Sequence, residues 1–92
     1  MKTQFGEGLF IKNDDNGHPC CIGDTVRVKV GKGIHFIEDH KIDLPEAEYE
    51  GILVLLKSKG VRIHTYNGLY IRPAFTKSSI RKWTWELIKS NQ

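Results

Sequence analysis

The chain has 92 residues, fourteen basic and eleven acidic side chains and a net charge of +3, and its hydrophobic content of 39% is typical of a folded globular domain. The longest apolar run, Ile52–Leu56, is too short to cross a membrane, which takes about 20 residues. The first residues lack the apolar stretch of a secretory signal, and the adjacent Cys20 and Cys21 are poorly spaced for a disulfide. We therefore expect one domain, residues 1–92, in the cytoplasm and without membrane contact.

Short β-branched and aromatic runs, separated by clusters of Gly, Asn and Asp, predict a chain built from β-strands. The first expected strand is Leu9–Lys12, and a turn at residues 13–17 follows it. Thr25–Val30 alternates between valines and polar residues, which predicts a half-buried strand. Residues 34–38 alternate in the same way and predict another short strand.

The middle of the chain is expected to hold a long loop and then a central strand. Residues 39–48 form that loop, and residues 45–49 suit a single helical turn because they begin with a proline. Residues 49–57 are apolar on both faces, as in a strand that is covered on both sides. Residues 78–82 suggest a second short helical turn, and residues 83–88 predict a closing strand, with a short helix as the alternative.

The two runs that flank residues 66–68 predict a β-hairpin whose register decides which side chains are buried. A two-residue loop would set His64 beside Ile71, whereas a three-residue loop pairs Ile63 with Ile71 and gathers the apolar side chains on one face. Such loops commonly end in a left-handed residue, so we predict a positive φ at Gly68.

The strands together predict a mainly β fold, a small antiparallel SH3-like barrel of five to six strands. Its predicted core draws on apolar side chains from four of these strands: Val26, Val28, Ile52, Val54, Ile63, Leu69 and Ile71. The Gly23-Asp24 pair predicts a tight turn in which the aspartate carboxylate accepts backbone N–H groups.

No catalytic or metal-binding pattern stands out in the sequence. The turn at residues 13–17 resembles part of a calcium loop, but its alignment puts Lys12 and Gly23 where oxygen ligands are needed. Cys20 and Cys21 have no spacer between them, unlike paired zinc ligands, and no third group is evident that would orient a Cys–His nucleophile. We therefore expect a non-enzymatic protein with no metal or cofactor.

A basic block marks the candidate binding surface. Between Gly51 and Lys82 there are seven basic side chains and no acid, which predicts either an anion-binding surface or a solvated face. In the outward side chains of the hairpin, guanidinium groups suit phosphates and tyrosine suits stacked bases. We expect this set, named here the hairpin face, to bind nucleic acid: Lys57, Lys59, Arg62, His64, Tyr70 and Arg72.

A different class of function is also open, because Tyr and Arg are enriched at protein interfaces as well. The alternative is a protein-interaction or assembly module that forms a homo-oligomer. Strand edges, or the segment that holds Trp83 and Trp85, would then join the copies.

A short motif resembles the N-terminal signature of YopX-type proteins, small proteins often carried by phages and other mobile elements. Asp15-Asn16-Gly17 is followed, after five residues, by Gly23-Asp24-Thr25-Val26. In that family the second part opens a strand of an SH3-like barrel. The resemblance covers residues 15–26 and implies an SH3-like fold and a mobile-element origin. It implies no active site, because the family has no defined activity.

Overall fold

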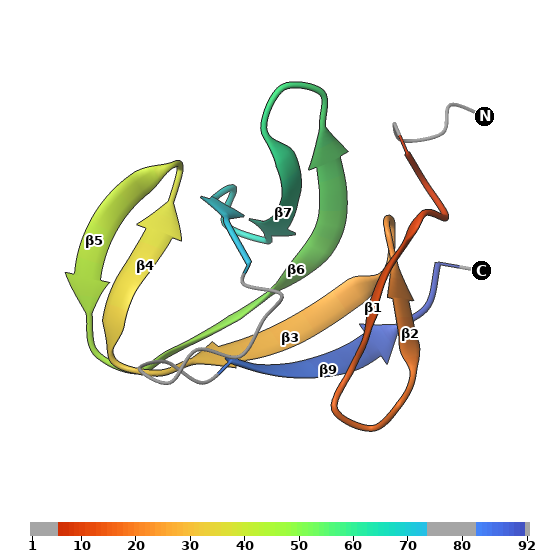
Figure 1. The fold of residues 1–92 in the computed structure, drawn as a ribbon, viewed down its shortest axis with the longest axis horizontal. Helices are drawn as coiled ribbons and strands as arrows, with labels where there is room; N and C mark the ends of the chain where they lie inside the picture. Colours follow the sequence, from red (N-terminus) through yellow and green to blue (C-terminus); the bar gives the residue numbers. More distant parts are fainter. Residues whose placement is uncertain (1–5, 74–82, 92) are drawn as a thin grey trace.

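The computed structural model describes residues 6–73 and 83–91, and within these ranges every regular element is a β-strand. All strand pairs are antiparallel: β1 and β2 form a separate hairpin, and the other strands form one sheet (Figure 1). The predicted mainly β, antiparallel fold is therefore confirmed. The strands are β1 Phe10–Asn13, β2 Pro19–Cys21, β3 Thr25–Val30, β4 Gly33–Ile37, β5 His40–Leu44, β6 Ala47–Leu56, β7 Gly60–Thr65, β8 Tyr70–Ile71 and β9 Trp83–Lys89.

The described residues hold nine strands rather than five to six, and β2 and β5 were not predicted. β5 lies inside the expected loop of residues 39–48. The chain folds straight back after β4 because Glu38 and Asp39 adopt φ angles of 52° and 66°, the backbone that a tight two-residue hairpin turn requires.

The expected helical turn at residues 45–49 is wrong. Residues 45 and 46 form a bend, and Ala47 already pairs with Val30 in the sheet, so the chain is extended where a helical turn was expected. The expected turn at residues 78–82 lies outside the described residues. The closing strand is confirmed as β9, which pairs with β3 and excludes the helical alternative there.

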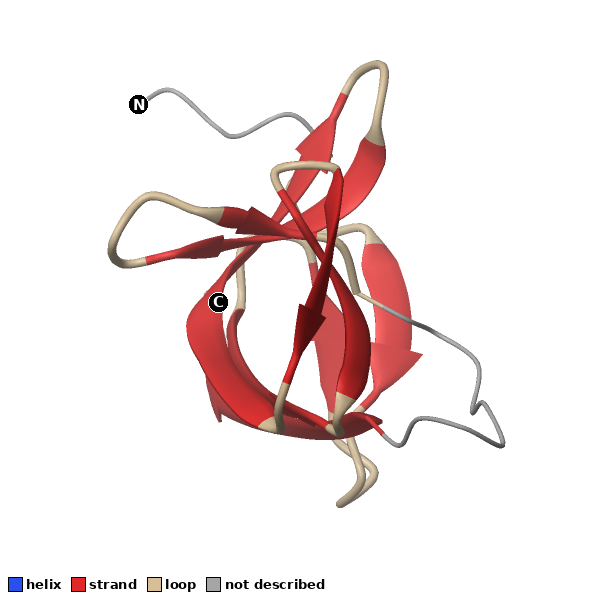
Figure 2. Ribbon diagram, turned by 90° about the vertical axis from the view of Figure 1, so that its left-hand side faces the viewer, coloured by secondary structure: helices blue, strands red, loops and turns tan. Residues whose placement is uncertain are grey.

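The seven-stranded sheet, called here the main sheet, has the order β5-β4-β8-β7-β6-β3-β9. It curves round its inner face (Figure 2), and its two end strands lie on different sides of the molecule (Figure 1). No pairing joins β5 to β9 within the described residues. The structure thus shows a curved antiparallel sheet, and closure into a barrel stays a prediction.

The core lies on the inner face of the main sheet. The fully buried hydrophobic side chains are Cys20, Ile22, Val26, Val28, Val30, Leu53, Ile63, Ile71 and Trp85. Of the predicted core, Leu69 is half-buried and packs against this cluster, whereas Val54 is half-buried opposite Arg62 and was wrongly assigned to the core. Ile52 is 36% exposed, so its assignment to the core is wrong. Leu53 takes its place because Leu53 pairs with Ile63 on the inner face, whereas Ile52 pairs with His64.

The register predicted for the β7–β8 hairpin is confirmed. Ile63 pairs with Ile71, and the Thr65 N–H group donates to the Leu69 carbonyl at 2.8 Å, which closes a three-residue loop. Gly68 has a φ of 91°, the left-handed conformation that such a loop needs at its end. The outward side chains of β7 and β8 therefore share one side of the sheet.

Two aspartates fasten the β1–β2 turn to the outer edge of β9. The Leu87 N–H group donates to the Asp14 carboxylate at 2.8 Å, and the Trp85 N–H group donates to the Asp15 carboxylate at 3.1 Å. The Asp15 N–H group donates in turn to the Trp85 carbonyl at 3.1 Å. This pair, named here the aspartate clamp, binds backbone groups that β3 does not use.

The predicted turn at Gly23-Asp24 is confirmed as a structural feature. Gly23 has a φ of 104°. The Asp24 carboxylate accepts the N–H group of Cys21 at 2.9 Å and that of Asn91 at 2.8 Å. Asp24 therefore ties β2 to the end of the chain that follows β9.

Candidate nucleic-acid interface

The hairpin face occupies the outer side of β7 and β8 and the turn that joins β6 to β7. Arg62 and His64 come from β7, Tyr70 from β8, and Arg72 from the residue that follows it. Because side chains alternate along a strand, residues two apart point to the same side. Arg62 and His64 therefore share the outer side, as do Tyr70 and Arg72. Lys57, Lys59 and Arg72 are exposed, and His64 and Tyr70 are half-buried. Five of the six predicted residues are therefore accessible at the surface.

Arg62 is the exception, and its predicted exposure is wrong. Only 7% of this residue is exposed. Its Nη2 atom donates to Asp39 Oδ1 at 2.9 Å, and its Nη1 atom donates to the Val61 carbonyl at 2.8 Å. The cause is the turn between β4 and β5, which brings Asp39 against the guanidinium group. Arg62 therefore links β7 to the turn between β4 and β5, and its guanidinium group does not lie at the surface.

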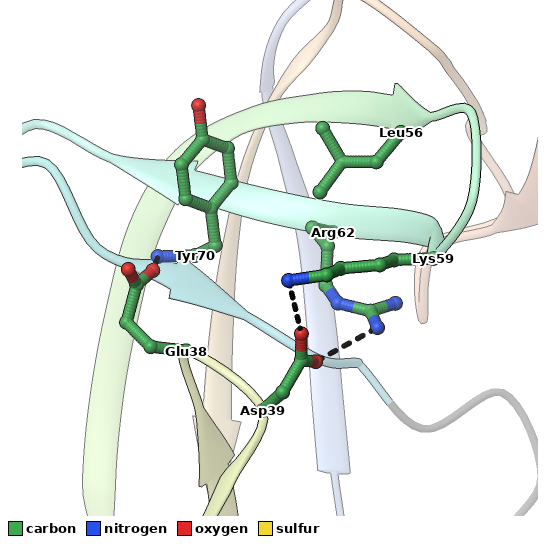
Figure 3. Close-up of a pocket in the computed structure, with 6 residues that line it drawn as sticks. All are labelled: Glu38, Asp39, Leu56, Lys59, Arg62 and Tyr70. Carbon is green, nitrogen blue, oxygen red and sulfur yellow. Dashed lines mark hydrogen bonds and ion pairs between the residues drawn. The ribbon is translucent and has the colours of Figure 1, made fainter.

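Asp39 is shared by two cations that approach it from different elements (Figure 3). Lys59 Nζ lies 3.0 Å from Asp39 Oδ2, while Arg62 holds the other carboxylate oxygen. The hydrogen bond from Lys59 first, and then that from Arg62, lowers the pKa of Asp39 below its ordinary value of 3.8. Asp39 is therefore ionised at neutral pH and offsets part of the positive charge of the hairpin face.

A hollow of about 290 Å³ lies beside this ion pair, at the small end of the range for ligand pockets. Its lining combines side chains from two turns and three strands: Glu38, Asp39, Leu56, Lys59, Arg62 and Tyr70 (Figure 3). The Tyr70 N–H group donates to Glu38 Oε2 at 2.6 Å. Two carboxylates thus enter a region that is free of acids in the sequence.

His64 and Tyr70 form a stacked pair on the outer face. Their ring centroids are 4.4 Å apart and their planes differ by only 4°. The pair forms because these residues face each other across β7 and β8 in the observed register. On β6, the other neighbour of β7 in the sheet, Ile52 pairs with His64. A partly exposed strip of apolar and aromatic side chains therefore crosses three strands.

Arg72 lies next to this strip. Its guanidinium carbon is 5.3 Å from the ring centroid of Phe36 on β4, a cation–π contact that keeps the charge at the surface. Phe36 faces Lys41 across β4 and β5, and Lys41 is also exposed. Lys41 is thus a further cation on the same side of the sheet that the basic block did not include.

The sequence reasoning missed the contributions of Glu38, Asp39 and Lys41. All three fall outside the acid-free block, in or beside the segment expected to be a loop. A signal was present, since residues 40–44 alternate after Asp39, a residue type that tolerates left-handed backbone. That pattern would have predicted the β4–β5 hairpin and brought these charges beside β8.

The cysteines carry no sign of activation. Both are free thiols. Burial raises the pKa of Cys20 to about 11 and also raises the pKa of Cys21, so both favour the protonated, unreactive form. Among residues 6–73 and 83–91, no three His, Cys, Asp or Glu side chains are arranged to hold a metal ion. The same ranges contain no helix with the length and apolarity of a membrane span.

The chain matches no protein-family model, no curated protein and no solved structure.

Proposed function

We propose that this protein is a non-enzymatic binding module that holds single-stranded nucleic acid on the outer side of β7 and β8. The stacked His64–Tyr70 pair, which is partly exposed, carries the proposal, because aromatic rings beside cations are how small β-domains bind bases without reading their sequence. Arg72 lies two residues after Tyr70, and the β6–β7 turn adds Lys57 and Lys59. The strand would follow these cations with a base on the aromatic pair.

The basic residues of the hairpin face have different roles because their surroundings differ. Arg72 and Lys57 are exposed and suit phosphate contacts. Arg62 is bound to Asp39 and acts as a positioning residue that fixes the turns on either side of the hollow. Lys59 is 56% exposed at its side chain and lies at the rim, where it can reach a phosphate while it neutralises Asp39.

Glu38 and Asp39 set limits on this binding. Their negative charges oppose phosphate, so we expect modest affinity that weakens as salt rises. For single strands, each phosphate contact changes log K by about −0.7 for every unit of log salt. A slope that corresponds to two or three contacts would fit the cations available.

Fluorescence anisotropy with short labelled single-stranded oligonucleotides, at low and physiological salt, tests the proposal. Tyr70→Ala should lose about 1–3 kcal/mol of binding free energy if a base stacks there. Arg72→Glu should weaken binding and flatten the salt dependence. Lys32→Glu makes the same change of charge at an exposed site outside the hairpin face and should alter binding little. A folded sample that binds no oligonucleotide at low salt would contradict the proposal.

We also propose a cytoplasmic location and a phage or mobile-element origin. The free thiols of Cys20 and Cys21 support a reducing compartment. The YopX-like motif at residues 15–26 supports the origin.

A further inference from the structure

β5 forms one end of the main sheet, and no described strand pairs with its outer edge. The turn at Glu38-Asp39 joins Ile37 to His40, so these two form the hydrogen-bonded pair that closes the hairpin. Hydrogen-bonded and non-hydrogen-bonded pairs alternate along antiparallel strands. The backbone N–H and C=O groups of Lys41 and Asp43 therefore point away from β4.

The side chains of this edge are accessible as well. Every residue of β5 except Leu44 is exposed, and Ile42 is 37% exposed. An exposed edge with unpaired backbone groups is a template for another strand. What it accepts depends on the side chains that would face the incoming strand.

We propose that a second copy of this chain binds here, with the two β5 strands antiparallel about a two-fold axis at Ile42. Lys41 of each copy then lies opposite Asp43 of the other. Both residues direct their backbone groups outward, so each Lys41–Asp43 pair exchanges both of its hydrogen bonds. Ile42 faces Ile42 in a non-hydrogen-bonded pair, where side chains approach most closely.

The charges select this register over its neighbours. A shift by one residue would set outward backbone groups against inward ones and remove the hydrogen bonds. A shift by two would place Lys41 opposite Lys41, or Asp43 opposite Asp43, and like charges directly opposite each other are destabilising. Only the register centred on Ile42 satisfies both the backbone and the charges.

Charged residues on an edge often serve to prevent pairing. That role suits charges of one sign, which repel any copy of the same chain. Lys41 and Asp43 have opposite signs and lie two residues apart, so they repel a copy in the shifted registers and attract it in one. The edge is therefore complementary to itself.

Concentration-dependent sedimentation tests the dimer and its charge pairing together. The unmodified protein should pass from one to two chains as its concentration rises. Lys41→Asp or Asp43→Lys alone should raise the dissociation constant about tenfold or more, since each change turns two opposite-charge pairs into like-charge pairs. An equimolar mixture of these two variants should associate again, because each acidic edge then faces a basic one.

Two further measurements make the result specific. Lys32→Asp and Glu46→Lys repeat the charge changes at exposed sites outside β5 and should leave the dimer intact. Amide exchange of Lys41 and Asp43 should slow as the concentration rises, while that of Ile42, which faces β4, should not change. Circular dichroism confirms that each variant is folded.

A protein that stays monomeric at the highest concentration it tolerates would overturn the proposal. A dimer that the charge variants leave unchanged, or a mixture of variants that does not associate, would also overturn it. Sedimentation is run without nucleic acid, so these outcomes do not depend on whether the protein binds an oligonucleotide.

Discussion

Asp39 Oδ1 accepts a hydrogen bond of 2.9 Å from Arg62 Nη2, across a separation of 23 residues in the chain. The contact joins the turn between β4 and β5 to the middle of β7. It also explains why the most central basic side chain of the hairpin face is the least exposed of the six. The same bond that removes Arg62 from the surface fixes the hollow beside Tyr70.

Arg62→Met should reduce stability without removing the binding surface. Methionine keeps an unbranched apolar stem but loses the hydrogen bonds to Asp39 and Val61, which should cost about 1–3 kcal/mol of unfolding free energy. Urea denaturation measures this change. Arg72→Met, at an exposed site, should cost much less stability and should weaken oligonucleotide binding more. The reverse ranking would show that Arg62 contacts the ligand.

The aspartate clamp should make the protein sensitive to acid. Burial, the largest single influence on Asp14, acts to raise its pKa, but the backbone N–H groups of Leu87, His18 and Asn16 together outweigh it and lower the pKa below 3.8. The stabilisation is thus complete above the unfolded value of 3.8 and is lost as the pH falls through the lower folded value.

Asp14→Asn tests the clamp directly. The amide would set an NH₂ group against one of the N–H donors, which should cost about 1–3 kcal/mol near neutral pH. Thermal unfolding between neutral pH and about pH 3 should show a smaller acid-induced fall for the variant than for the unmodified protein. An equal fall in both would mean that other carboxylates control the acid transition.

Two isoleucines on neighbouring strands provide a matched test of the core. Ile63 is fully buried, so Ile63→Ala should cost about 2–5 kcal/mol, including the cavity it leaves. Ile52 is 36% exposed on the outer face, and Ile52→Ala should cost no more than about 1 kcal/mol. Chemical denaturation of both variants checks the register, since a shift of one residue in β6 would bury Ile52 and remove the difference between the two costs.

Glu38→Gln should strengthen nucleic-acid binding. The substitution removes a negative charge next to Tyr70 but keeps an oxygen that can accept the Tyr70 N–H group. We expect a gain of about threefold in affinity at low salt, which disappears as salt screens the charge. Glu46→Gln, at an exposed site before β6, is the control. A weaker complex with Glu38→Gln would mean that the carboxylate contacts the ligand favourably.

The parts of the fold that the sequence predicted are those where a local pattern permits one answer. The valines of β3 alternate strictly with polar residues, so their burial followed directly. The β7–β8 hairpin was equally determined, because only one loop length gathers Ile63 and Ile71 on the same face. Gly68 agreed with that loop, and both expectations hold in the structure.

The failures occurred where the deciding contact is distant in sequence or where the pattern is symmetrical. Residues 52–56 are apolar on both faces, so alternation could not tell Ile52 from Leu53, and the pairing with β7 decides it. The exposure of Arg62 depends on Asp39, which lies on a turn that composition made look like a loop. A stretch of sequence without acidic residues can therefore still lie beside acidic side chains from other parts of the folded chain.

The aspartate clamp also makes the two ends of the main sheet chemically different. Asp14 and Asp15 already take up the outward N–H groups of Leu87 and Trp85, so the middle of the β9 edge is sealed by the chain itself. A sheet with two unpaired edges could add further copies indefinitely, because each added copy presents another unpaired edge. In a dimer joined through β5, the two remaining edges of the sheet would both be β9 edges, each covered by its aspartate clamp. Growth of such an assembly would then stop at two chains, and no filament would form.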